Sequence, residues 1–222
     1  MIEHFEEADR RNPPPKDAIL FVGSSTFTMW TTLAEDFKPL PVINRGFGGS
    51  TYDDLLRYMD RIVIPYRPRV IVLYEGNNDL AREGTTAEDV FGNLKTFEAR
   101  TRAALPLATI LCLSIKPSPS RFHLWPEVQR ANRLIREHIA HRDKVKYIDI
   151  TRLMLGADGR PLGDLFLEDR LHMNRQGYLR WIPVLRAELE SAFGGASQDK
   201  RSTTLPGEQA PVPCNPTPRS LK

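Results

Sequence analysis

Three residues of this sequence have the side chains that nucleophilic catalysis requires. Ser25 lies in a short run of hydroxyl residues, and Asp169 and His172 stand three residues apart near the other end of the chain. A serine hydroxyl is a poor nucleophile until an imidazole takes its proton, and a carboxylate usually holds that imidazole in the required tautomer. These residue types indicate acyl transfer through Ser25, with His172 as the base and Asp169 as its partner.

Attack on a carbonyl group also requires hydrogen-bond donors for the oxygen that becomes negatively charged. The backbone N–H groups of Ser25 and Gly49 and the side-chain amide of Asn78 could provide three such donors. Glycine permits close approach of the backbone, and asparagine is a donor whose charge does not change with pH. We therefore expect these three donors to form an oxyanion hole. The loss of one such donor typically raises the activation free energy by about 2.7–4 kcal/mol.

Each of these features is also common in proteins without catalytic activity. Hydroxyl residues after a strand usually form a turn or a helix cap, and Gly46, Gly48 and Gly49 can serve a tight turn. Asn78 can cap a helix, and the neighbouring Asp79 suits that role better. An Asp and a His at this spacing often form an isolated surface pair. Only the combination of all these segments favours catalysis.

The elements expected between these segments explain how they could meet. Apolar runs bounded by Gly, Pro or polar turns predict five strands. They span residues 19–22, 41–44, 70–74, 109–113 and 145–149. Helical patterns alternate with them, which is typical of an α/β sandwich with a mainly parallel sheet of about five strands. Ser25, Gly49 and Asn78 follow the first three strands, and ligands of such folds bind at the carboxyl ends of strands.

Start and stop signals predict where the helices lie. Thr51 with Asp54, and Thr85 with Glu88, have the spacing of a capping box at a helix N-terminus. The last helix is expected to end at Gly194, because glycine commonly follows a helix C-terminus.

Length and composition fit one domain followed by a tail. The chain has 222 residues, of which 41% are hydrophobic and 27% charged, and this is enough to bury a core. We expect a single domain over residues 1–195. Residues 196–222 hold five of the 18 prolines, few large apolar residues and no periodic pattern, so we expect a disordered tail there.

Charge and hydropathy narrow the range of partners. The net charge is +3, and residues from 196 onward hold a surplus of two positive charges, which leaves +1 for the rest. A nearly neutral domain without a basic stripe gives no electrostatic case for binding nucleic acid. No apolar run reaches the roughly 18 residues of a membrane span. The acidic segment 1–7 lacks the apolar core of a signal peptide, so we expect a cytoplasmic protein. From the residues suited to acyl transfer, we expect its substrate to be a small-molecule ester.

Four blocks of the sequence, taken in order, resemble those of the SGNH, or GDSL-type, hydrolases. The blocks are Gly23-Ser24-Ser25, Asn44-Arg45-Gly46-Phe47-Gly48-Gly49, Gly76-Asn77-Asn78-Asp79 and Asp169-Arg170-Leu171-His172. The resemblance implies a flavodoxin-like three-layer α/β/α fold and ester hydrolysis without a metal or cofactor. It assigns the catalytic triad to Ser25, Asp169 and His172. It assigns the oxyanion hole to Ser25, Gly49 and Asn78.

One position departs from the family pattern. The family usually has Asp before the nucleophile, and this chain has Ser24 there. The nucleophile could therefore be Ser24 or Ser25. We assign it to Ser25, because that residue occupies the family's serine position.

Two other functions are open on the same residues. An acyltransferase would use the same groups but exclude water, and a non-catalytic relative would bind an acylated sugar or lipid without turnover. The complete set of five residues favours an enzyme. The sequence defines neither the acyl chain, nor the alcohol, nor the oligomeric state.

Two further groups of residues have a functional and a simpler explanation. The loop after the fourth strand holds Arg121, Phe122, His123, Leu124 and Trp125, and we expect these residues to form a wall of the substrate pocket. His138 and His141 lie three residues apart on an expected helix, as a metal-binding pair could. A solvent-exposed face near a helix C-terminus, where cations are favoured, explains them more simply, so we expect no metal site.

Overall fold

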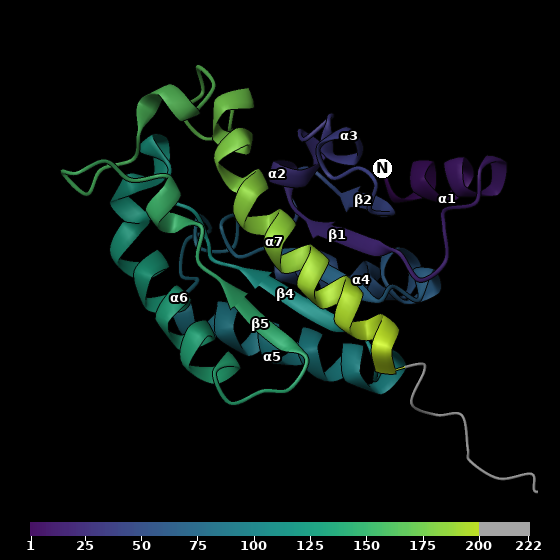
Figure 1. Cartoon of the computed structure of the whole chain (residues 1–222). Helices are drawn as coiled ribbons and strands as arrows, with labels where there is room; N and C mark the ends of the chain where they lie inside the picture. Colours follow the sequence, from purple (N-terminus) through teal and green to yellow (C-terminus); the bar gives the residue numbers. More distant parts are fainter. Residues whose placement is uncertain (200–222) are drawn as a thin grey trace, which may run out of the picture.

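The chain folds around one parallel β-sheet. A computed structural model describes residues 1–199, and Figure 1 shows how its elements are arranged. The strands lie in the order β2-β1-β3-β4-β5, and each neighbouring pair is parallel. Their bounds are β1 Ile19–Gly23, β2 Val42–Gly46, β3 Val70–Tyr74, β4 Thr109–Leu113 and β5 Val145–Ile148. This strand order confirms the flavodoxin-like fold.

Helices connect the strands. The α-helices of the described residues are α1 Ile2–Arg11, α2 Ser25–Thr28, α3 Leu33–Asp36, α4 Tyr52–Ile62, α5 Ala87–Ala104, α6 Trp125–Ile139 and α7 Arg175–Asp199. Short 3-10 helices are η1 Ile64–Tyr66, η2 Pro119–Leu124, η3 Thr151–Leu153 and η4 Gly163–Leu165.

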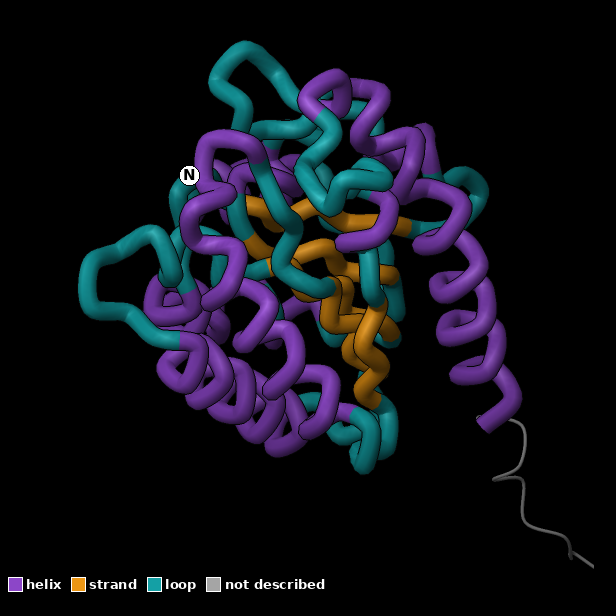
Figure 2. The backbone as a smooth tube through the Cα atoms, turned by 90° about the vertical axis from the view of Figure 1, so that its left-hand side faces the viewer, coloured by secondary structure: helices purple, strands orange, loops and turns teal. Residues whose placement is uncertain are grey.

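The sheet lies between two layers of helices, as Figure 2 shows. Helices α4, α5 and α6 pack on one face, and α2, α3 and α7 pack on the other. The residues of β1 alternate between the two sides. Leu20 and Val22 join the core under α4–α6, whereas Ile19 and Phe21 join the core under α7. Because both faces are covered, every residue of β1 is buried, which explains its uninterrupted apolar sequence.

Two predicted helix starts are close to those in the structure. The capping box of α4 is formed by Thr51 and Asp54, as predicted. The capping box of α5 is formed by Thr86 and Asp89. The predicted pair, Thr85 and Glu88, was therefore wrong by one residue.

The last helix is longer than predicted. Helix α7 continues through Gly194 to Asp199, so the predicted stop is wrong. A glycine inside a helix costs about 1 kcal/mol relative to alanine, which lowers stability but does not itself end the helix. The predicted domain end at residue 195 falls within α7. Residues 196–199 of the predicted tail (196–222) belong to this helix, and its remainder, 200–222, lies outside the described residues.

None of the helices in residues 1–199 is both long enough and apolar enough to cross a bilayer. The expected cytoplasmic location stays a prediction.

Candidate active site

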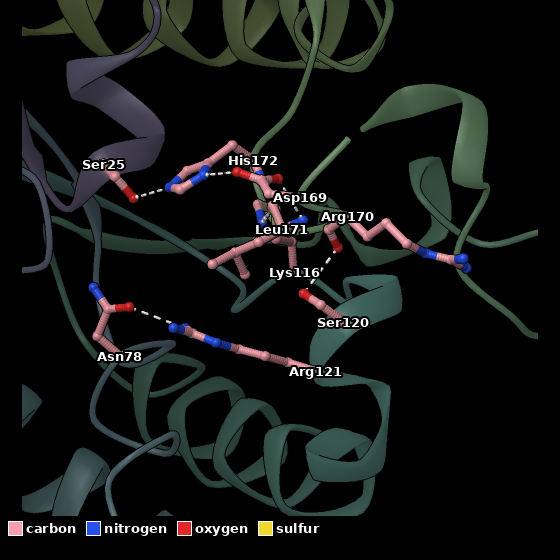
Figure 3. A network of polar contacts seen from close by, with 9 residues as sticks. All are labelled: Ser25, Asn78, Lys116, Ser120, Arg121, Asp169, Arg170, Leu171 and His172. Carbon is pink, nitrogen blue, oxygen red and sulfur yellow. Dashed lines mark hydrogen bonds and ion pairs between the residues drawn. The ribbon is translucent and has the colours of Figure 1, made fainter. Parts of the chain in front are cut away.

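Ser25, His172 and Asp169 lie in line near the carboxyl ends of the strands (Figure 3). The Oγ atom of Ser25 is 2.9 Å from Nε2 of His172. On the other side of the ring, Nδ1 is 2.5 Å from Oδ2 of Asp169. Ser25 and His172 are 147 residues apart in the chain, so the tertiary fold brings them together.

Both carboxylate oxygens of Asp169 have hydrogen-bond partners. While Oδ2 faces the imidazole, Oδ1 accepts bonds from the backbone N–H groups of Leu171 and His172, both at 2.9 Å. Arg170, which directly follows Asp169, has φ 57, a left-handed conformation that is uncommon for a residue other than glycine. Burial acts to raise the pKa of Asp169, but the bonds from His172 and Leu171 outweigh it and lower the pKa to about 2. Asp169 is therefore an anion at neutral pH that can hold a proton on Nδ1 of the ring.

A tight turn carries the chain from β1 to Ser25, the first residue of α2. Gly23 has φ +149, and a Cβ atom there would lie 1.9 Å from the carbonyl oxygen of Tyr74 in β3. Only glycine fits at this position. Ser24 follows as the buried N-cap of α2, and its carbonyl group accepts the first hydrogen bonds of the helix. Of the two serines, Ser25 is the one that bonds to His172.

Two hydrogen bonds orient the side-chain amide of Asn78. Its Nδ2 donates to the carbonyl oxygen of Ser50 at 2.9 Å, and its Oδ1 accepts from Nη1 of Arg121 at 2.9 Å. One hydrogen of the amide nitrogen is left for another acceptor. Gly49, with φ +76, lies in the turn before α4, and the N–H group of Ser25 begins a helix and so has no acceptor within it. The three predicted oxyanion donors thus follow three neighbouring strands.

A small hollow lies beside Ser25. Of the predicted triad and oxyanion residues, Ser25, Asn78 and His172 line it, whereas Gly49 and Asp169 do not. Its lining also includes Arg121, from the loop expected to wall the pocket, and Lys116, which the sequence reasoning missed. The only signal for Lys116 was its place in a Pro-interrupted loop directly after the fourth strand. A larger hollow of about 560 Å³ lies beside the start of α5. Its lining is mainly acidic and polar, and neither Ser25 nor His172 belongs to it. The chemistry therefore favours the smaller hollow.

Of the five residues predicted to wall the pocket, Arg121 lines this hollow and the other four lie outside its lining. Phe122 and Trp125 stack on each other with ring centroids 6.3 Å apart. Trp125 is the first residue of α6 and packs against the hydrophobic core, and His123 is exposed. Arg121, directly before them, is the residue of this loop that lines the hollow.

Two carboxyl groups are buried after β3. Ser50 Oγ donates to Oε1 of Glu75 at 2.5 Å, and the backbone N–H of Tyr52 donates to Oδ1 of Asp79 at 3.0 Å. Burial raises the pKa of Glu75 well above its ordinary value; the bond from Ser50 opposes this and the nearby Asp79 adds to it. Burial likewise raises the pKa of Asp79 to about 6. Asp79 binds the first residue of α4, so it has the helix-capping role that the sequence suggested.

The two histidines considered as a metal-binding pair have separate surroundings. Nε2 of His138 lies 2.7 Å from Oε2 of Glu98, and its ring packs edge-on against Phe91. The prediction of an exposed face holds for His141 but is wrong for His138, which is largely buried. Within residues 1–199 there is no group of three or more His, Cys, Asp or Glu side chains that could hold a metal ion.

A flavodoxin-like fold with a serine, a histidine and an aspartate aligned near the carboxyl ends of its strands is typical of a hydrolase. The sequence model of the GDSL-like Lipase/Acylhydrolase family matches residues 21–180. The chain belongs to this family, which confirms the resemblance found from the four sequence blocks. No protein with a curated description matches the chain.

Solved structures with this fold are distant in sequence. A candidate acylhydrolase from Bacteroides fragilis has a TM-score of 0.75 and 19% identity, over 86% of this chain and 96% of that one. A GDSL-like lipase from Bacteroides thetaiotaomicron has a TM-score of 0.72 and 21% identity, over 86% and 98%. A variant of an acetyl-xylooligosaccharide esterase from Geobacillus Stearmophilus has a TM-score of 0.63 and 16% identity, over 82% and 95%. At these identities the likeness shows a shared fold.

Proposed function

We propose that this protein hydrolyses carboxylic esters through a covalent acyl-enzyme formed on Ser25. The observation that carries the proposal is the continuous line of hydrogen bonds from Ser25 through His172 to Asp169. An anionic Asp169 keeps the imidazole proton on Nδ1, so that Nε2 is free to accept the proton of Ser25. The nucleophile can therefore be activated without a large movement of the chain.

The reaction has two halves that use the same base. Oγ of Ser25 attacks the ester carbonyl while Nε2 of His172 takes its proton, and the new oxyanion is stabilised by donors at Ser25, Gly49 and Asn78. His172 then protonates the leaving alcohol, and the acyl group stays on Ser25. Water, activated by the same imidazole, attacks the acyl-enzyme, releases the acid and restores the serine.

Access for water favours hydrolysis over acyl transfer. The side chains of His172 and Asp169 are 25% and 46% exposed. An acyltransferase has to keep water away from its acyl-enzyme. A protein that only binds an acylated sugar or lipid has no need of a proton acceptor beside Ser25.

The hollow beside Ser25 favours a short acyl group. Its small size and its polar and cationic lining leave little apolar surface for a long chain. One of the structurally similar proteins is an acetyl-xylooligosaccharide esterase, whose substrate also carries a short acyl group. We expect faster hydrolysis of p-nitrophenyl acetate than of the octanoate, and no loss of activity with metal chelators.

Replacement of the nucleophile tests the proposal. We expect Ser25→Ala to lower kcat on p-nitrophenyl acetate by at least about 10³-fold, because the acyl-enzyme cannot form. Ser24→Ala is the matched control and should keep most of the activity. A fluorophosphonate should label the wild-type protein at Ser25 and leave Ser25→Ala unlabelled. Full activity of Ser25→Ala, or loss in Ser24→Ala alone, would show that the nucleophile is wrongly assigned.

A further inference from the structure

The segment between β4 and α6 contacts both halves of the active site. It spans residues 114–124 and contains Lys116 and Arg121, which line the hollow beside Ser25. Figure 3 shows Arg121 extending to Asn78, while Lys116 and Ser120 lie against the turn that carries the catalytic base. The reaction steps described above give these residues no role.

Arg121 fixes two consecutive asparagines through one guanidinium nitrogen. Its Nη1 donates to the backbone oxygen of Asn77 at 3.0 Å, to the side-chain oxygen of Asn77, and to Oδ1 of Asn78 at 2.9 Å. The two ends of an asparagine amide are similar in shape, so the amide can turn over unless its oxygen and nitrogen have distinct partners. The bond from Arg121 engages the oxygen end of Asn78. The nitrogen end is thereby directed to Ser50, next to Gly49.

Lys116 and Ser120 hold the turn that carries the base. Nζ of Lys116 donates to the carbonyl oxygen of Leu171 at 2.8 Å and lies 5.4 Å from the ring centroid of Phe166. The backbone N–H and the hydroxyl of Ser120 both donate to the carbonyl oxygen of Arg170, at 3.1 and 3.0 Å. Arg170 is the residue in the left-handed conformation. Both residues between Asp169 and His172 are therefore bonded to the 114–124 segment.

The burial of Lys116 is unfavourable by itself. Lys116 is only 2% exposed. This burial, together with the positive charge of Arg121, lowers the pKa of Lys116 to about 7, although the negative charge of Asp169 opposes the shift. Removing a lysine from water destabilises its charged form. An apolar side chain would fill the same space without this cost, but it could not donate to the carbonyl oxygen of Leu171. A role in positioning explains why the site holds a lysine.

We propose that Lys116 and Arg121 are positioning residues for ester hydrolysis. Arg121 orients the oxyanion donor Asn78, and Lys116 holds the turn that presents His172 to Ser25. The inference rests on the proposed function, because it assigns both side chains to that reaction.

Kinetics of Arg121→Gln and Lys116→Met test the inference. We expect each variant to lower kcat on p-nitrophenyl acetate by about 10- to 100-fold, because a small misplacement of a catalytic group has an effect of this size. KM should change much less than kcat, because the role assigned to each residue is to hold a catalytic group in place. Arg133→Gln, on the exposed face of α6, is the control and should leave both constants unchanged.

Double-mutant cycles separate positioning from general destabilisation. Arg121→Gln should have no further effect on kcat in an Asn78→Ala background, whereas Lys116→Met should keep its full effect there. Conversely, Lys116→Met should have no further effect on the residual activity of His172→Ala, whereas Arg121→Gln should keep its effect. A loss of general stability would reduce activity in every background alike.

Three results would overturn the inference: an unchanged kcat in both single variants, effects that add fully in both cycles, or a rise in KM with kcat unchanged. Thermal melts establish that each variant is folded at the assay temperature. Should Lys116→Met or Arg121→Gln be unfolded at that temperature, Ser120→Ala and Arg121→Lys are the milder tests. An unchanged kcat in both of these variants would count equally against the inference.

Activity of Ser25→Ala defeats the proposed function itself. An inactive Ser25→Ala with unaffected Lys116 and Arg121 variants defeats only this inference.

Discussion

The base and its carboxylate are arranged within a single short turn of chain. Asp169 bonds through one oxygen to the imidazole of His172 and through the other to two backbone N–H groups of the same turn. The orientation of the ring is therefore set mainly by local structure. Only the contact between His172 and Ser25 depends on the packing of distant segments.

Asp169→Asn tests the role of the carboxylate. An asparagine amide can donate to Nδ1 and so favours the tautomer with the proton on Nε2, which cannot accept from Ser25. We expect kcat on p-nitrophenyl acetate to fall by about 10²- to 10⁴-fold. Asp164→Asn, an exposed carboxylate close by in the sequence, is the control.

The pH profile gives a second measure of the same residue. The pKa of Asp169 is lowered to about 2, so Asp169 stays ionised throughout an assay from pH 4 to 9. Any acid limb of wild-type activity in this range must then come from another group. An Asp169→Asn variant with more than half of the wild-type kcat would show that the carboxylate is not needed.

At the scale of elements, the connection from β1 to α2 positions the nucleophile. Gly23 pairs with Tyr74 of β3 and with Gly46 of β2 in the sheet register. The helix that begins at Ser25 is packed so closely on β2 that a Cβ atom at Gly46 would lie 2.6 Å from Phe27. The place of Ser25 is thus determined by two close backbone approaches that leave no room for side chains.

Gly23→Ala tests this close approach. The new Cβ atom would overlap the carbonyl oxygen of Tyr74, which is backbone and cannot move aside. We expect the free energy of unfolding to fall by about 3 kcal/mol or more, measured by urea denaturation.

The matched control is Gly92→Ala, in the interior of α5, where a Cβ atom meets nothing within 4 Å. Alanine should raise the free energy of unfolding there by about 0.8–1.0 kcal/mol. Equal and small effects at both glycines would show that the contact with Tyr74 is not a tight one.

The elements could be predicted from sequence where the signal is local. Strands β3 and β4 have the predicted bounds because their apolar runs are buried on both sides and end at polar turns. The start of α5 was wrong by one residue because two capping boxes overlap there. Thr85 precedes Glu88 by three residues, and Thr86 precedes Asp89 by three residues, so spacing alone does not choose between them.

The positions of the loop residues after β4 could not be predicted. Arg121 reaches Asn78 across 43 residues of chain, and Lys116 reaches Leu171 across 55. No periodic pattern records contacts at such separations. Trp125 was expected near the substrate because it follows a strand end, but the start of α6 places it against the core.

At the scale of the whole molecule, the sheet separates two apolar cores, and buried polar groups lie at its carboxyl edge. Glu75, Asp79 and Lys116 are each less than a tenth exposed. One oxygen of Glu75 and one of Asp79 are buried without a hydrogen-bond partner in the described part of the chain. Such groups lower stability, so this edge is less stable than an apolar core would be.

The pH dependence of stability follows from Glu75. Its pKa in the folded protein is raised by burial above the ordinary value of 4.5. The folded state therefore binds more protons than the unfolded state above that pH. The contribution of Glu75 to the free energy of unfolding is fully present below pH 4.5 and is lost as the pH rises through the pKa of Glu75 in the folded state.

Glu75→Gln should reduce this loss, because a glutamine keeps the shape and does not ionise. We expect the free energy of unfolding to fall less between pH 5 and pH 8 in the variant than in the wild type. Asp79, whose pKa is raised to about 6, should still contribute to the fall that remains. Glu83→Gln, at an exposed position, should leave the pH dependence as in the wild type. An identical slope in Glu75→Gln and wild type would rule out Glu75 as the cause.

The bond between Asp169 and His172 within one short turn has an evolutionary consequence. Mutations that remodel loops other than the 114–124 segment, and with them the range of esters accepted, leave the imidazole and its carboxylate in register with each other. New specificities can therefore arise in descendants of this chain without the proton-transfer pair being rebuilt, and diversification can proceed one loop at a time.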